Sequence, residues 1–124
     1  MGETNGRSEF TQSGGLLRQW EIHTFDFQPE GPHPVVILSS NARVHLKDRV
    51  NVLICSSQRA GRPPHDNELM LDAADGLDWP SLCKCDLSYL VPKDGLYNQR
   101  GLVSAERRRA IVQKLIQSFE FNRL

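Results

Sequence analysis

The segment from Ser81 to Pro92 reads SLCKCDLSYLVP and is typical of a long β-strand. Because side chains alternate between the two faces of a strand, Cys83 and Cys85 are expected to point to one side. Lys84 and Asp86 then point to the other side. Free cysteine behaves as a small buried hydrophobe, so the cysteine face is expected in a core. The opposite face carries a cation and an anion, which indicates either a surface ion pair or half of an active site.

Other short segments are expected to form strands that pair with this one. They lie at residues 16–27, 35–39, 50–57 and 67–72. The apolar runs VVILS and VNVLICSS predict buried strands. In LLRQWEIHTFDF the apolar positions change phase near His23 and Thr24, which predicts a β-bulge at that point.

The segment SAERRRAIVQKLIQSFEF is typical of an amphipathic helix. Ser104 is a plausible N-cap. Ile111, Leu115 and Phe119 follow at four-residue spacing and predict an apolar stripe that faces the sheet. About five short strands with turn-forming residues between them and one terminal helix predict a mainly β fold with a C-terminal helix. The expected architecture is a small, strongly curved antiparallel barrel.

The length and composition are those of one globular domain. The chain has 124 residues, and 39% of them are apolar, enough for a single core. Residues 1–15 are polar and rich in Gly, Ser and Thr, so we expect a flexible N-terminal tail followed by one domain at 16–124. Fifteen basic and fifteen acidic residues give a net charge of zero, so any nucleic-acid site must come from local clustering of charge.

The three cysteines are expected to be core thiols. Cys83 and Cys85 are too close along one strand for an ordinary disulfide, and no cysteine has zinc-ligand spacing with a histidine pair. These features predict a reduced, cytoplasmic protein with neither a metal site nor a cofactor. No segment is apolar over the length that a membrane span needs, so no membrane partner is expected.

Read in order, VVILSS, LICSSQ and LCKCDLSYLVPK, followed by the terminal helix, resemble the MazF/PemK family. These proteins are the toxins of type II toxin–antitoxin systems. The resemblance runs from about Trp20 to Phe119. It implies an SH3-like barrel that usually forms a homodimer, and metal-independent cleavage of single-stranded RNA, mRNA above all. It also implies neutralisation by an acidic antitoxin protein.

The resemblance points to particular positions. His33 falls where many relatives have an Arg before a Pro. Ser56 and Ser57 fall on a Thr/Ser pair that ends a strand. Lys84 and Asp86 flank a Cys, as a basic and an acidic residue do in the PemK branch.

Cleavage through the 2'-hydroxyl of RNA needs a base, an acid, and donors that hold the charged phosphorane. Asp86 and His33 can supply the base and the acid in either assignment, while Lys84 and Ser56 can hold the phosphate. The resemblance therefore implies a catalytic set and an RNA-binding set. The catalytic set is His33, Lys84, Asp86 and Ser56. The RNA-binding set is Ser57, Arg59, Arg62 and Tyr89, with Tyr89 or Trp79 available to stack a base.

Each of these features also has a purely structural interpretation. Lys84 and Asp86 can be a solvated pair on a sheet face, and His33 between two prolines can be a loop residue. Ser56 can satisfy local backbone groups at a strand end. The basic run Arg107–Arg109 can be a solvated helix face, or it can be a docking patch for an acidic antitoxin or for RNA.

Two other functions fit the same fold. Relatives with this barrel poison a DNA gyrase without cutting nucleic acid, so the chain can be a non-catalytic inhibitor of a protein partner. It can also be a degenerate homologue that only binds an antitoxin. A ribonuclease requires His33, Lys84 and Asp86 to meet at one cleft, and the other two functions do not.

Overall fold

The computed structural model describes residues 17–57 and 62–119. The predicted flexible tail at residues 1–15 lies outside the described residues, as does Arg59. The following strands, helices and topology refer to the described part of the chain.

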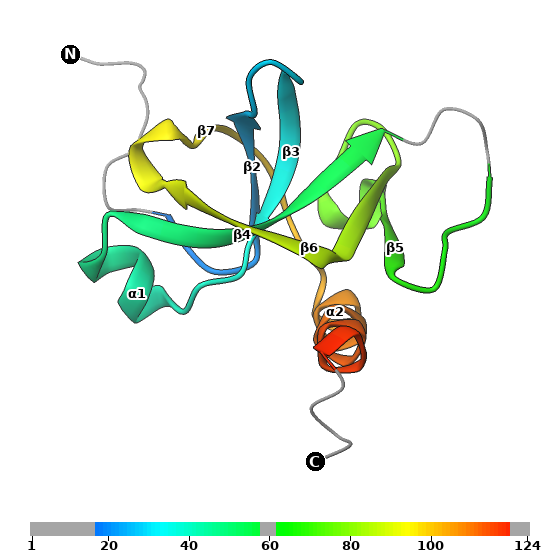
Figure 1. Ribbon diagram of the computed structural model, residues 1–124. Helices are drawn as coiled ribbons and strands as arrows, with labels where there is room; N and C mark the ends of the chain where they lie inside the picture. Colours follow the sequence, from blue (N-terminus) through cyan, green and yellow to red (C-terminus); the bar gives the residue numbers. More distant parts are fainter. Residues whose placement is uncertain (1–16, 58–61, 120–124) are drawn as a thin grey trace.

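One curved antiparallel sheet dominates the fold (Figure 1). Its six strands are β2 (Glu21–Asp26), β3 (Pro32–Ile37), β4 (Arg49–Ser57), β5 (Glu68–Leu71), β6 (Ser81–Pro92) and β7 (Tyr97–Leu102). They lie in the order β5-β6-β4-β3-β2-β7. Two α-helices, α1 (Asn41–Leu46) and α2 (Ala105–Phe119), and two 3₁₀ turns, η1 (Ala73–Asp75) and η2 (Lys93–Gly95), complete the chain. The sheet is a half-barrel with a C-terminal helix, which confirms the predicted fold class.

The predicted strands are present, with small differences at their ends. Val35, Val36 and Ile37 on β3 are fully buried, as expected for a central strand. The bulge predicted near His23 and Thr24 is also confirmed, because the register between β2 and β7 shifts between Ile22 and Thr24.

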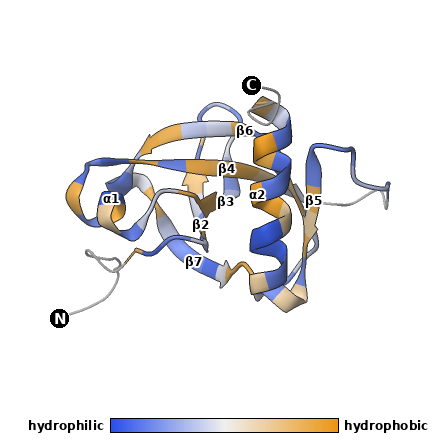
Figure 2. Cartoon of the chain, turned by 90° about the horizontal axis from the view of Figure 1, so that it is seen from below, coloured by the Kyte–Doolittle hydropathy of each residue, from blue (hydrophilic) through white to orange (hydrophobic). Residues whose placement is uncertain are grey.

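Two hydrophobic clusters lie on opposite faces of the sheet. The first contains all three cysteines and Ile111 of α2. The second contains Val44 of α1 together with residues of β3, β4 and β6. Figure 2 shows α2 across the strands and α1 toward the other end of the sheet. Each face of the central strands is therefore covered, which explains their continuous apolar runs.

The apolar stripe on α2 faces the sheet only in part. Ile111 is fully buried and Leu115 packs against the first cluster, whereas the side chain of Phe119 is 58% exposed. The prediction is therefore wrong at Phe119. An α-helix has about 3.6 residues per turn, so each four-residue step rotates the side chain by about 40° from the one before.

Strand β7 was not predicted. Its sequence, YNQRGL, is polar and contains a glycine, and its side chains are exposed or half-buried because it pairs only with β2 at the edge of the sheet. Gly101 is required there because η1 packs directly against it. A Cβ atom at this position would lie 2.1 Å from the carbonyl oxygen of Asp75.

Candidate functional site

Strand β6 bends sharply where it passes the middle of β4. Ser88 lies opposite Leu53, and Cys83 lies opposite Cys55, so five residue steps on β6 match two on β4. Residues 84–87 stand against Ile54 alone and form a bulge that we call the β6 corner. Bulges are frequent next to active sites because they redirect side chains.

The β6 corner separates core side chains from polar ones. Cys83 and Cys85 are fully buried, as the alternation predicted. The side chain of Lys84 is 36% exposed, and Asp86 is exposed. The polar pair therefore lies on the accessible side of the corner, and the cysteines anchor the corner in the core.

His33 lies on β3 rather than in a loop, since β3 begins at Pro32. Its Nδ1 atom is 3.2 Å from the carbonyl oxygen of Cys55 on β4. Val35 pairs with Ile54, and continuing that register by two residues places His33 opposite Ser56. Two of the predicted catalytic residues thus come from neighbouring positions on adjacent strands.

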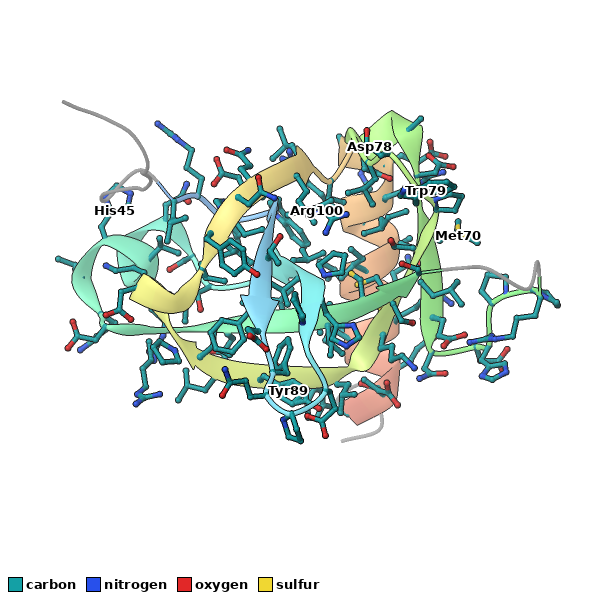
Figure 3. All side chains as sticks on the ribbon, turned by 90° about the horizontal axis from the view of Figure 1, so that it is seen from above. His45, Met70, Asp78, Trp79, Tyr89 and Arg100 are labelled. Atoms are coloured by element: carbon teal, nitrogen blue, oxygen red, sulfur yellow. The ribbon has the colours of Figure 1, made fainter. Side chains whose placement is uncertain are left out.

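A cleft of about 610 Å³ opens between the β2–β3 turn and β6. Its lining residues are Phe25, Asp26, Phe27, Gln28, Glu30, His33, Ile54 and Tyr89. Its wall is aromatic, because the ring of Phe27 lies 4.9 Å from Phe25, 5.0 Å from Tyr89 and 6.1 Å from His33 between centroids. In Figure 3 Tyr89 lies beneath the β2–β3 turn, far from Asp78 and Trp79.

The cleft lining includes His33 but neither Lys84 nor Asp86, and the β6 corner is related to the cleft only through Ile54. The corner interrupts the β4–β6 pairing between Leu53 and Cys55, which is the position of Ile54, and Ile54 lines the cleft. His33 and the corner that carries Lys84 and Asp86 are therefore both next to residues 54–56 of β4.

The other predicted RNA-binding residues lie at different places in the structure. Tyr89 lines the cleft and is half-buried. Ser57 is the exposed last residue of β4 and lies opposite Ser81. Trp79, the alternative stacking residue, is 70% exposed on the other side of the molecule from Tyr89 (Figure 3).

Glu68 organises the charges around Lys84, and no motif or spacing in the sequence points to it. Glu68 pairs across the strands with Lys84, and its side chain is only 3% exposed. Its carboxylate accepts hydrogen bonds from both terminal nitrogens of Arg62, at 2.8 and 3.0 Å, and from the backbone N–H of His65, at 2.9 Å. Lys84 Nζ lies 3.8 Å from the same carboxylate.

These donors keep Glu68 ionised. The hydrogen bonds from Arg62 and then from the His65 backbone lower the pKa of Glu68 to about 2 against the opposing effect of burial. Lys84 therefore has an anionic neighbour on β5 that holds its ammonium group near the corner. Arg62, predicted to bind RNA, also forms an ion pair within the chain.

The basic run at the start of α2 is largely engaged within the chain. Arg107 donates to the carboxylates of Asp72 and Asp75, and Arg108 Nε donates to the carbonyl oxygen of Val103 at 2.8 Å. Asp75 also accepts the backbone N–H of Ser104 at 2.9 Å. Of these three arginines only Arg109 is exposed, so the run is neither a plain solvated face nor a continuous docking patch.

The three free thiols are buried, which lowers their reactivity. The pKa of Cys83 is raised by its hydrogen bond with Cys55, and the pKa of Cys85 is raised by its hydrogen bond with Cys83 and by burial. Within residues 17–57 and 62–119, no group of three or more His, Cys, Asp or Glu side chains is placed to hold a metal ion. Among the same residues, no helix is long and apolar enough to cross a membrane.

Comparison with known proteins gives the family of this chain. The model of the PemK-like, MazF-like toxins of type II toxin–antitoxin systems matches residues 18–119. No curated protein matches the chain significantly. The chain belongs to this toxin family.

Solved structures share the fold of this chain. The toxin MazF-mt6 of Mycobacterium tuberculosis is 26% identical, with a TM-score of 0.68 over 81% of this chain and 96% of that chain. A mycobacterial endoribonuclease in complex with its cognate antitoxin is 19% identical, with a TM-score of 0.74 over 86% and 97% of the two chains. The MazE–MazF complex of Deinococcus radiodurans is 17% identical, with a TM-score of 0.66 over 84% and 95%.

Proposed function

We propose that this protein is a toxin endoribonuclease that cleaves single-stranded RNA, mRNA above all, without a metal ion. The observation that supports the proposal is that His33 and the β6 corner both adjoin residues 54–56 of β4, and that His33 lines an aromatic cleft. An imidazole, a carboxylate and an ammonium group are the groups that attack by a 2'-hydroxyl requires.

The proposed roles follow from the chemistry of each side chain. Asp86 and His33 share the two proton transfers: one takes the proton of the 2'-hydroxyl, and the other protonates the leaving 5'-oxygen. Lys84 and the hydroxyl of Ser56 stabilise the negative charge that develops on the phosphorane. The products are a 2',3'-cyclic phosphate and a free 5'-hydroxyl. Ser57, Arg59 and Arg62 are proposed to steer the RNA backbone, and Tyr89 to stack a base.

We also propose that an antitoxin protein neutralises the toxin and that the active form is a homodimer. The support for the antitoxin is family membership and the solved complexes of an endoribonuclease with its cognate antitoxin and of MazE with MazF. The homodimer is what the resemblance to the family implies. The molar mass of the full chain in solution, measured by light scattering, tests the homodimer.

Cleavage of a long single-stranded RNA in EDTA tests the ribonuclease. We expect discrete cuts that end in 2',3'-cyclic phosphate. Removing one acid–base group by Asp86→Asn or His33→Gln should lower the cleavage rate by about 10²- to 10⁴-fold. The pH–rate profiles of the two variants assign the roles, because each variant loses the limb that the removed group controls.

Two exposed residues away from the cleft provide matched controls. Asp78→Asn and His45→Gln make the same chemical changes at sites that Figure 3 places far from Tyr89, and both variants should cleave at the wild-type rate. Intact RNA with the wild-type protein would contradict the proposal. Cleavage that stops in EDTA would contradict the metal-independent mechanism.

A further inference from the structure

The tip of the β2–β3 turn gives the cleft a wall of unusual composition. The turn is closed by two backbone hydrogen bonds of 3.0 Å, from the N–H of Phe27 to the oxygen of Gly31 and from the N–H of Glu30 to the oxygen of Phe27. Gly31 adopts a φ of 94°, a conformation that glycine adopts readily. The closed turn holds Glu30 at the cleft beside the aromatic cluster of Phe27.

The charge of this wall is opposite to that of a phosphate site. Asp26 and Glu30 are among the lining residues, and the lining contains neither Lys nor Arg. A phosphodiester placed between these carboxylates would be repelled. Aromatic rings with hydrogen-bonding groups at the edge instead suit a nucleobase, which is flat and neutral.

The carboxylate of Glu30 is available to such a base. No residue of the described chain donates a hydrogen bond to the side chain of Glu30 or forms an ion pair with it. An ionised carboxylate only accepts hydrogen bonds, so it favours bases that present N–H donors. Guanine offers two neighbouring donors, N1–H and the 2-amino group. Adenine and cytosine offer one amino group, and uracil offers a single N–H between two carbonyl oxygens that repel a carboxylate.

We infer that the turn-side cleft is a base-recognition subsite in which Glu30 selects an amino-bearing base, guanine above all, and rejects uracil. The inference rests on the proposed RNA substrate and adds a specificity-determining residue to it. Phe27 and Tyr89 supply the stacking surface, while the phosphate lies toward the β6 corner, where Lys84 supplies positive charge.

Binding of non-cleavable oligonucleotides to the full chain tests this inference. The probes are fluorescein-labelled heptamers of 2'-O-methyl RNA with six uridines and a central guanosine, adenosine, cytidine or uridine. They lack the attacking 2'-hydroxyl, so fluorescence anisotropy reports binding alone. We expect the guanosine heptamer to bind about 5- to 100-fold more tightly than the uridine heptamer, as good carboxylate–base contacts do. Because the difference comes from the base, this ratio should stay constant between low and high salt.

Glu30→Ala should abolish the difference by weakening only the heptamers with amino-bearing bases. Asp78→Ala removes one exposed carboxylate on the other side of the molecule and should leave the ratio unchanged (Figure 3). Equal affinity of the wild type for all four heptamers would overturn the inference. So would a uniform increase in affinity in Glu30→Ala, because it would mean that Glu30 only repels the RNA backbone.

The two proposals fail in different ways. A chain that discriminates among the heptamers but cleaves no RNA keeps the subsite and loses the ribonuclease. A chain that cleaves RNA but binds all four heptamers equally keeps the ribonuclease and loses the subsite.

Discussion

Glu68 lies on β5 with a buried carboxylate that Arg62 and Lys84 approach from two directions. A buried charge is costly unless it is paired and hydrogen-bonded, and here Arg62 supplies two hydrogen bonds and the backbone of His65 a third. The arrangement connects the β5 edge to the β6 corner. A structural ion pair and the proposed phosphate-binding lysine therefore share one anion.

We predict that replacing this anion lowers stability in a pH-dependent manner. The pKa of Glu68 is lowered from 4.5 to about 2 in the folded chain. A lowered pKa stabilises the fold fully above the unfolded pKa, and this stabilisation is lost as the pH falls from about 4.5 toward 2. Glu68→Gln should lower the free energy of unfolding by about 1–3 kcal/mol at pH 7 and flatten its decline below pH 4.5. Urea unfolding at pH 7, 4.5 and 3 measures both effects.

The matched control is Asp66→Asn, which changes an exposed carboxylate two residues away. It should alter the free energy of unfolding by less than about 0.5 kcal/mol at each pH. If Glu68→Gln and Asp66→Asn lower the free energy of unfolding equally at pH 7, the ion pairs of Glu68 do not stabilise the fold.

Among the elements, α2 carries three successive arginines near its N-terminus, which would normally destabilise the start of a helix. Cations near a helix N-terminus interact unfavourably with its dipole. Here Asp75 accepts the N–H of Ser104 at the helix start and also pairs with Arg107, which places an anion where the dipole favours one. Asp72 belongs to the same cluster, and Arg107 is the main cause of its lowered pKa. Arg107 thus links η1 to the start of α2.

We predict a sharp difference between neighbouring arginines. Arg107→Ala leaves the fully buried Asp75 side chain without its cation and should lower the free energy of unfolding by about 2–3 kcal/mol. Arg109→Ala changes an exposed side chain and should change it by less than about 0.5 kcal/mol. Thermal and urea unfolding compare the two variants. Equal losses would contradict the role given to Arg107.

The strands that can be predicted from the sequence are those whose own apolar side chains cause them to be buried. The apolar runs of β3 and β4 and the alternation in β6 identify these strands because hydrophobic burial forms them. Strand β7 has no such signal, since pairing with β2 and the close contact at Gly101 define it. Some residues of the site can likewise be recognised from the sequence, and others cannot. His33 and the Lys84–Asp86 pair stand out in the sequence, whereas the role of Glu68 depends on a cross-strand neighbour that sequence spacing does not reveal.

At the scale of the whole molecule, the two hydrophobic clusters cover both faces of the central strands, so these strands form a buried layer. Cys55, Cys83 and Cys85 all belong to the cluster beneath α2 and are fully buried. Cys55 and Cys83 face each other across β4 and β6, and Cys85 lies at the start of the β6 corner. Because the thiols are fully buried, a reagent reaches them only when the core around them opens, so their reactivity reports that opening.

We therefore predict that all three thiols react at one common, slow rate. Complete burial of all three thiols, together with the raised pKa values of Cys83 and Cys85, suppresses reaction in the folded chain. A thiol reagent should therefore label none of them within minutes at neutral pH and all three at once in denaturant. Because labelling follows the population of the open state, a loss of about 2 kcal/mol in Arg107→Ala should accelerate it about 30-fold at all three sites. Mass spectrometry after timed alkylation measures each cysteine separately. Rapid labelling of Cys85 alone would mean that the β6 corner opens independently of the core, and the corner would then be a mobile part of the site rather than a fixed wall.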